Sequence, residues 1–361
     1  MEEKGKKGRM DYTLLLIVVL LVVIGLVILY STSAYNGQVK FHDSFYYLKK
    51  QAFATVLGIV LMLFVAGMDY HIWQRLAVFG YLAAVALSVA VMLFGREING
   101  SKRWLALGPF SFQPSEFAKV ALILFLADLV TKNVKTIGKM WTLCRIMFWI
   151  LPIVGLVGAS NLSTAIIILG IGVILIFVAS PKYAQFALMG IAGACFMGIF
   201  LALESYRLER LAIWRNPEKY EKGYQTLQGL YAIGSGGVFG VGLGNSVQKL
   251  GFVPEAQNDM IFSIICEELG LAGAGIIVFL FLLLIWRFFL IASGSRDLFG
   301  ALIATGAMAH MMIQVILNIA VVTNTIPNTG ITLPFISYGG TSVMFLLIEM
   351  GLVLSVSQVV D

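Results

Sequence analysis

Long apolar runs recur along the whole chain, and they constrain its fold more than any other feature. The first run, Tyr12 to Tyr30, follows a basic segment and is about as long as the roughly 20 residues that a helix needs to cross a bilayer. A helix satisfies its own backbone hydrogen bonds, so a single run in this form can cross lipid. Nine further runs follow, at Ala52–Met68, Leu76–Phe94, Phe117–Val130, Ile146–Gly158, Ser163–Ser180, Phe186–Leu203, Leu269–Trp286, Leu298–Val322 and Ser342–Ser357. The sequence therefore predicts an all-α polytopic membrane protein with ten transmembrane helices, forming one integral membrane domain over residues 1–361.

The composition agrees with this class and excludes several others. The chain is 59% hydrophobic and 12% charged, whereas a soluble domain is about 45–50% apolar and about 25% charged. These values exclude a soluble enzyme, a disordered protein and a nucleic-acid-binding module. We interpret the net charge of +6 as a consequence of the protein's orientation in the membrane and of its contact with anionic lipid. We expect no nucleic acid as a partner. The three cysteines lie in apolar runs without a CxxC pair, which argues against disulfides and a zinc site.

The distribution of positive charge predicts the orientation. With the N-terminus inside, twelve of the 25 Lys and Arg residues fall in cytoplasmic segments. Seven fall in the short outer loops and the fourth helix, and six in the long loop Glu204–Asn258. Positive residues concentrate on the cytoplasmic side. We therefore expect both termini in the cytoplasm and the long loop outside the membrane, between the seventh and eighth helices.

The fourth predicted helix carries a pair of opposite charges near its start. Glu116 and Lys119 are three residues apart, so they share one helical face. Placing a charged side chain at membrane depth costs free energy, so such residues are first interpreted as functional. A structural ion pair at the membrane edge explains Glu116 and Lys119 equally well. Lys102 and Arg103 lie in the preceding outer segment. One carboxylate and three cations together suit the head group of an anionic, phosphorylated lipid.

Asp259 lies where the long loop returns to the membrane. An Asp in the first turn of a helix is stabilised in its ionised form by the helix dipole. Two interpretations stay open for it: a plain capping role, and a general base at the boundary between water and membrane. Glu267 and Glu268 follow, and we expect them to be buried polar groups that fix helix packing.

Other polar features inside the predicted membrane region carry weaker signals. We expect His310, inside the ninth predicted helix, to make a hydrogen bond that helps the helices pack. Glu349, in the last predicted helix, needs a partner or a water-filled cavity. The glycine-rich stretch Gly234–Gly244 is consistent with tight turns or with a backbone nest for phosphate. No GxxxxGK[ST] phosphate loop is present, which argues against ATP hydrolysis.

Eight short segments, taken together, resemble the SEDS family (shape, elongation, division and sporulation), which comprises the RodA, FtsW and SpoVE membrane glycosyltransferases. These segments keep the family's order along the whole chain, and the Gly242–Lys249 stretch is most similar to the FtsW and SpoVE branch. The segments are Gly100–Trp104, Phe112–Lys119, Gly223–Gln225, Ala232–Gly237, Gly242–Lys249, Pro254–Asp259, Glu267–Gly270 and Leu333–Gly340.

The resemblance implies an activity and a set of site residues. The family polymerises lipid II, a disaccharide-peptide on undecaprenyl diphosphate, into peptidoglycan glycan strands outside the cytoplasmic membrane. By motif, Asp259 matches its essential aspartate. The matching substrate-binding positions are Glu116, Lys119, Arg210 and Lys249. The family usually has His-Thr-Asp-Phe where this chain has Gln257-Asn-Asp-Met260, so the orienting role of that histidine is absent here or taken by Gln257.

The chemistry of such a polymerase fits a single dominant carboxylate. Inversion at the anomeric carbon takes one displacement, in which Asp259 serves as general base. The diphosphate leaves without a general acid if cations stabilise its charge. Arg103 joins Lys119, Arg210 and Lys249 as a candidate for that task. The sequence leaves open whether a divalent cation, Mg²⁺ or Mn²⁺, takes part at the lipid diphosphate, and it supplies no metal-ligand motif.

Two other classes of function fit the sequence less well than a polymerase. A lipid II flippase or transporter needs a polar path across the bilayer, whereas most charges here gather on the outer side. A scaffold for division proteins gives no reason for a buried Glu116–Lys119 pair. The resemblance also implies a class B penicillin-binding protein and other division proteins as partners. It implies a place in the bacterial cytoplasmic membrane at the division septum, although a septal, a sporulation and an elongation role all stay open.

Overall fold

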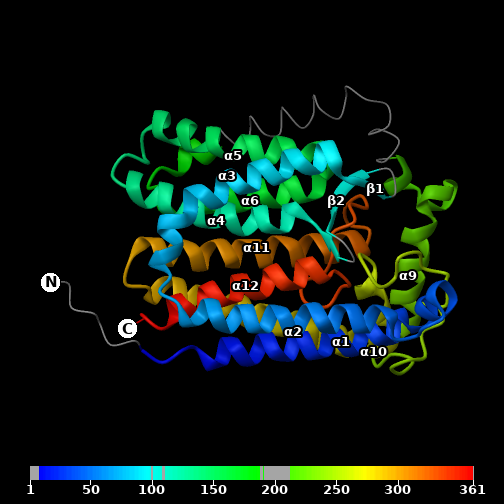
Figure 1. The fold of residues 1–361 in the computed structure, drawn as a ribbon. Helices are drawn as coiled ribbons and strands as arrows, with labels where there is room; N and C mark the ends of the chain where they lie inside the picture. The colour runs from blue at the N-terminus through cyan, green and yellow to red at the C-terminus, as the bar shows by residue number, and fades with distance from the viewer. Residues whose placement is uncertain (1–7, 99–100, 108–109, 188–189, 191–211, 361) are drawn as a thin grey trace.

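The computed structural model describes residues 8–98, 101–107, 110–187, 190 and 212–360, and it is a bundle of long helices lying side by side (Figure 1). Eight of the described helices are long and apolar enough to cross a membrane. They are α1 (Tyr12–Phe41), α2 (Tyr46–Gly67), α3 (His71–Phe94), α5 (Met140–Ser160), α6 (Leu162–Ala179), α10 (Ile261–Gly294), α11 (Leu298–Val322) and α12 (Gly340–Ser357). The predicted class, a polytopic helical membrane protein, is confirmed.

A ninth long helix, α4 (Pro114–Asn133), carries more charge than the other long helices and is enclosed by the bundle. It packs against α3, α5, α6, α11 and α12, and most of its side chains are buried. Because protein surrounds α4, Glu116, Lys119 and Asp128 are buried and have partners inside the bundle, whereas Lys132 near its end is exposed. The fourth predicted helix therefore exists, and it begins three residues earlier than its apolar run.

The seventh predicted helix, Phe186–Leu203, lies almost wholly outside the described residues, as does Arg210. The predicted total of ten helices thus stays a prediction. The described part of the long loop is folded, since it contains the short 3-10 helices η1 (Pro217–Lys219) and η2 (Glu221–Gly223) and the helix α9 (Tyr224–Gly236).

The α3–α4 connection of this mainly helical chain contains a small antiparallel sheet that was not predicted. Its strands are β1 (Arg96–Ile98), β2 (Ser101–Leu107) and β3 (Phe110–Phe112), in the order β1-β2-β3. The apolar runs give no signal for strands here, because a short connection outside the spans has no long periodic pattern. The sheet lies at the same end of the bundle as α9 (Figure 1).

Helix α10 is interrupted at Gly270, whose backbone (φ 68°, ψ −170°) is not helical. The loop after α9 runs alongside this break. The amides of Val241 and Gly242 donate to the carbonyls of Glu267 and Glu268, and the amide of Leu271 donates to the carbonyl of Gly237. A Cβ at Gly270 would lie 2.3 Å from the Gly240 amide nitrogen, so the close approach of these backbones requires glycine. The loop thereby satisfies the backbone groups that the break releases from α10.

The first and last described segments, around Gly8 and Gln358, lie together at one end of the bundle, opposite α9 and the sheet (Figure 1). The Gly8 amide donates to the Gln358 carbonyl at 2.6 Å. The Asp11 amide donates to Ser357 Oγ at 3.1 Å, and the Arg287 guanidinium pairs with the Asp11 carboxylate. The first and last described residues thus lie on the same side of the bundle, and which side of the membrane this is stays a prediction.

Candidate active site

Asp259 lies in the turn immediately before α10, and protein groups hold both its backbone and its side chain. Its carbonyl oxygen accepts a hydrogen bond of 2.9 Å from Asn318 Nδ2 on α11. Its carboxylate Oδ1 accepts one of 3.3 Å from Gln225 Nε2 at the start of α9. The carboxylate is half-buried, and Met260, not Asp259, is the residue that caps α10. The capping interpretation therefore has no support in the geometry.

The environment of Asp259 raises the pKa of its carboxyl group from 3.8 to about 6. Burial is the largest cause, and the negative charge of Glu255 acts in the same direction. Hydrogen bonds from nearby backbone amides and from Gln225 oppose the rise by stabilising the charged form. A carboxylate with this pKa is ionised at neutral pH and is a stronger base than an ordinary Asp.

A stripe of polar side chains on α11 connects Asp259 with the charged pair of α4. His310, Gln314 and Asn318 are spaced by four residues, so they lie on one helical face, and all three are buried. Lys119 Nζ lies 3.1 Å from Glu116 Oε2 and 3.3 Å from Gln314 Oε1. Glu116 and Lys119 thus face each other, as their spacing predicts.

The same stripe provides a partner for the isolated carboxylate of α12. Glu349 Oε2 lies 2.8 Å from His310 Nδ1, and His310 Nε2 lies 2.8 Å from Gln314 Oε1. A continuous chain of polar contacts therefore runs from Glu349 through His310 and Gln314 to Lys119. The packing role expected for His310 is present.

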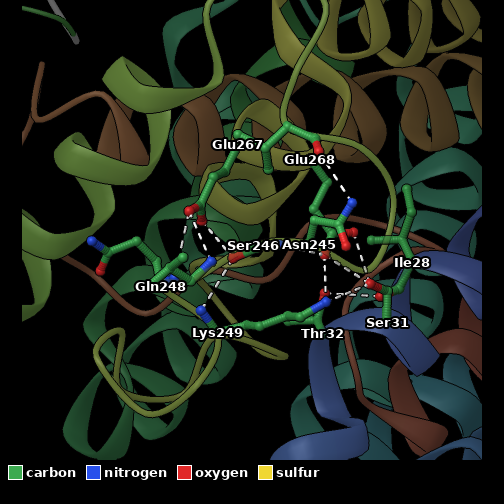
Figure 2. Close-up of polar contacts among 11 residues, drawn as sticks. Ile28, Ser31, Thr32, Asn245, Ser246, Gln248, Lys249, Glu267 and Glu268 are labelled. Carbon is green, nitrogen blue, oxygen red and sulfur yellow. Dashed lines mark hydrogen bonds and ion pairs between the residues drawn. The ribbon is translucent and has the colours of Figure 1, made fainter.

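Lys249 belongs to a second buried cluster, which joins the long loop to α1 and α10 (Figure 2). Lys249 Nζ lies 2.6 Å from Glu268 Oε1 and donates to Ser31 Oγ at 3.0 Å. Glu267 accepts hydrogen bonds from the hydroxyl of Ser246 and, at 3.0 Å, from the amide of Val247. Glu267 and Glu268 are thus buried groups that fix the loop, which agrees with the expected structural role.

An apolar groove of about 770 Å³ lies beside this cluster. Residues of α1 and α2 form one part of its wall, and Leu243, Gly244 and Lys249 of the long loop form the other. Two helices long and apolar enough to span a membrane, α1 and α2, thus form part of its wall. Its size and apolar lining suit a hydrocarbon chain.

The remaining predicted site residues lie apart from Asp259 or outside the described residues. Arg103, on β2, donates from Nε to the Ser160 carbonyl at 2.9 Å, and it lines one small cavity together with Ser115 at the start of α4. Gln257 does not orient Asp259: its side chain contacts Asn36 and Glu255, with Asn36 Nδ2 donating to Gln257 Oε1 at 3.2 Å.

No role was predicted from the sequence for three carboxamide residues around Asp259: Gln225, Asn318 and Asn328. Asn328 Nδ2 donates to Gln225 Oε1 at 3.1 Å, so it holds the residue that holds Asp259. The four-residue spacing of His310, Gln314 and Asn318 on an otherwise apolar helix was a usable signal. Gln225 lies in the Gly223–Gln225 segment that carries the family resemblance, but nothing in the sequence indicated a role for its side chain. Asn328 gave no signal, because neutral amides in loops are common.

The fold and this site define a polytopic membrane protein with a basic carboxylate just outside its spanning helices, supported by a polar network inside the bundle. The family model for FtsW, RodA and SpoVE, described as "Cell cycle protein", matches residues 12–361. The chain belongs to this family.

Individual relatives cover nearly the whole chain. The chain is 40% identical to "Stage V sporulation protein E" of Bacillus subtilis (strain 168), over 98% of each chain. It is 35% identical to the "Probable peptidoglycan glycosyltransferase FtsW" of Trichlorobacter lovleyi, over 96% of this chain and 93% of that one.

Solved structures share the fold. A chain in a structure described as "Structural coordination of polymerization and crosslinking by a peptidoglycan synthase complex" superposes with a TM-score of 0.83 at 30% identity, covering 96% of this chain and 97% of that one. The crystal structure of the rod shape determining protein RodA of Thermus thermophilus superposes with a TM-score of 0.72 at 28% identity, covering 96% of each chain.

Proposed function

We propose that this protein is a peptidoglycan glycosyltransferase that polymerises lipid II at the outer face of the cytoplasmic membrane. Family membership and the named glycosyltransferase relatives support the reaction class. The observation that carries the site assignment is Asp259, a half-buried carboxylate with a raised pKa, held between α9, α10 and α11. A polymerase of this kind needs one base at the membrane surface, and Asp259 has the properties of one.

In the proposed step, Asp259 removes the proton from the acceptor sugar hydroxyl as that oxygen attacks the anomeric carbon of the donor. A new carbon–oxygen glycosidic bond forms, and the bond between the anomeric carbon and the diphosphate oxygen breaks. The electron pair of that bond leaves with the lipid diphosphate. The proton is transferred to Asp259 and is later released to water, which restores the base for the next addition.

Charge stabilisation of the leaving diphosphate is the second requirement. Lys119 and Lys249 are each paired with one buried carboxylate, Glu116 and Glu268, so binding a phosphate would require either lysine to exchange that partner. Arg103 and Arg210 complete the proposed set of cations. Among the described residues no group of three or more His, Cys, Asp and Glu could hold a metal. A divalent cation would therefore be bound mainly by the diphosphate itself.

The groove between α1, α2 and the long loop is the proposed seat of a lipid II hydrocarbon chain. Its lining is mostly apolar, two candidate spanning helices form part of its wall, and Lys249 of the loop places a charged group there. A chain seated here would keep its diphosphate end near the outer loop that carries Asp259.

We further propose that the protein works with a class B penicillin-binding protein at the division septum. A glycan polymerase alone makes strands without crosslinks, and one structural relative comes from a peptidoglycan synthase complex described as coordinating polymerisation with crosslinking. The similarity to both SpoVE and FtsW relatives supports division or sporulation as the cellular process.

A gel assay of purified protein on labelled lipid II, with and without the class B partner, tests the proposal. Loss of the general base in Asp259→Asn should slow polymerisation by about two to four orders of magnitude. Thermal unfolding of the same sample confirms that it is folded. Near-normal glycan strands from a folded Asp259→Asn protein would remove Asp259 from the mechanism. A lipid II flippase is the outcome if the wild-type protein moves lipid II across vesicles without joining it.

A further inference from the structure

The carboxylate of Asp259 has two oxygens in different surroundings. Oδ1 accepts from Gln225 Nε2 at 3.3 Å. Oδ2 lies toward Gly330, since a Cβ built on that glycine would be 3.9 Å from it. No side chain among the described residues donates a hydrogen bond to Oδ2. The side-chain contacts of the two oxygens therefore differ: Gln225 holds Oδ1, whereas Oδ2 lies beside Gly330.

Gln225 is itself fixed at both ends of its carboxamide. Asn328 Nδ2 donates to Gln225 Oε1 at 3.1 Å. Because that oxygen accepts from Asn328, the amide nitrogen must point the other way, toward Oδ1 of Asp259 and the Pro254 carbonyl, 3.2 Å away. Asn328 is in turn anchored, since its Oδ1 accepts from the Gly330 amide at 3.1 Å.

We infer that Gln225 is a positioning residue for the general base, with Asn328 setting the orientation of its carboxamide. Gln225 holds Oδ1, so Oδ2 is presented beside Gly330 to the acceptor hydroxyl. This inference rests on the proposed role of Asp259 as the base. It also explains how the chain orients that base although Gln257 stands where the family usually has a histidine.

A positioning donor affects both the geometry and the protonation of the base. A hydrogen bond donated to a carboxylate stabilises its charged form, so its loss raises the pH at which the base becomes active. The charged group that acts on Asp259 in the opposite sense is Glu255. Gln225, Asn318 and Asn328, contributed by α9, by α11 and by the segment after it, carry no charge.

The test compares Gln225→Met with Gln228→Met, a change of the same type one helical turn further along α9. Single-turnover polymerisation of labelled lipid II by the full-length protein is measured from pH 5 to pH 9. For Gln225→Met we expect the midpoint of the rate profile to move up by about one pH unit. We expect its plateau rate to fall by about ten- to hundredfold. Gln228→Met should match the wild type in both respects.

Two further variants, Gln225→Glu and Asn328→Ala, test the same positioning role. Gln225→Glu retains an acceptor for Asn328 but adds a negative charge beside Asp259, so its midpoint should rise further than that of Gln225→Met. Asn328→Ala should move the midpoint in the same direction by a smaller amount, and it serves if Gln225→Met does not fold.

The positioning role is overturned if folded Gln225→Met has the same midpoint of its pH–rate profile as the wild type. If Gln225→Met does not fold, an unchanged midpoint in Asn328→Ala overturns it. Asp259→Asn, assayed in parallel, separates this failure from failure of the proposed function. An inactive Asp259→Asn with an unchanged Gln225→Met profile removes only the positioning role, whereas an active Asp259→Asn removes the base itself.

Discussion

Asn318 Nδ2 donates hydrogen bonds to two carbonyl oxygens at once, that of Asp259 at 2.9 Å and that of Ile331 at 2.7 Å. One buried side chain on α11 thereby joins the turn that carries Asp259 to the segment beside Gly330. Its neighbour on the same helical face, Gln314, contacts Lys119. The polar interior of the bundle and the proposed base at its edge are therefore parts of one connected structure.

The first prediction follows from these two hydrogen bonds of Asn318. Replacement of Asn318 by Leu leaves the Ile331 and Asp259 carbonyls without their donor, which should lower the free energy of unfolding by about 1–3 kcal/mol. Polymerisation should fall as well, because the base loses its fixed backbone. Asn133→Leu is the control, since the side chain of Asn133 bonds only to the Leu129 carbonyl of its own helix. Thermal unfolding in detergent and the gel assay measure the two effects, and equal behaviour of the two variants would contradict the prediction.

The sequence predicted the helices well and the contacts between them poorly. Apolar runs identify spans because lipid leaves the backbone few alternatives to a helix, and even α4, with its charges, was recognised. The break at Gly270 was not predicted, since it depends on a loop that satisfies the freed backbone groups. Pairings such as Lys249 with Ser31 and Gln225 with Asn328 join residues 218 and 103 positions apart. No local pattern in a single sequence encodes such pairs, whereas the three-residue spacing of Glu116 and Lys119 does.

The second prediction concerns the pH dependence of the rate. The base is active only when Asp259 is ionised, and its pKa is about 6. The rate should therefore rise with pH through about 6 and level off above it. Single-turnover measurements over this range test the prediction. A midpoint near 4, the ordinary value for Asp, would show that burial does not act on this carboxyl in the working enzyme.

The third prediction is that Asp259 costs stability at neutral pH. Its pKa is higher in the folded protein, about 6, than the ordinary 3.8, so folding favours the protonated form. The stability associated with that form is complete below pH 3.8 and is lost as pH rises through 6. The shift sets an upper limit of about 3 kcal/mol. Removal of the charge in Asp259→Asn should thus raise the thermal midpoint at pH 8.

This third prediction corrects the expectation that the helix dipole stabilises the ionised form of Asp259. The reason for the correction is that Asp259 is half-buried and precedes the cap of α10. The comparison of Asp259→Asn with the wild type should be repeated at pH 4, where the difference between them should nearly vanish. A lower midpoint for the variant at both pH values would contradict the prediction.

The fourth prediction separates pairing from substrate binding at Lys119. Replacement of Lys119 by Met leaves the Glu116 carboxylate buried without its partner, which should destabilise the protein by about 3–5 kcal/mol. The double variant with Glu116→Gln should recover most of that loss. Lys49→Met, which breaks the more exposed pair with Asp43, is the control and should change stability little. If the stable double variant also recovers polymerisation, the pair is structural, and if it stays inactive, the charges serve the substrate.

The fifth prediction tests the groove as the seat of a lipid chain. Ala34 on α1 and Ala52 on α2 both line it, and Trp at either position would fill part of its volume of about 770 Å³. Displacement of two or three methylenes of a bound chain costs about 2 kcal/mol. The lipid II concentration needed for half-maximal rate should therefore rise by roughly tenfold or more. Leu82→Trp, on the exposed face of α3, controls for the addition of an indole ring to the membrane surface. The maximal rate should be retained, because the groove is separate from Asp259. A loss of maximal rate without any change in the concentration dependence would assign the groove a role other than holding the chain.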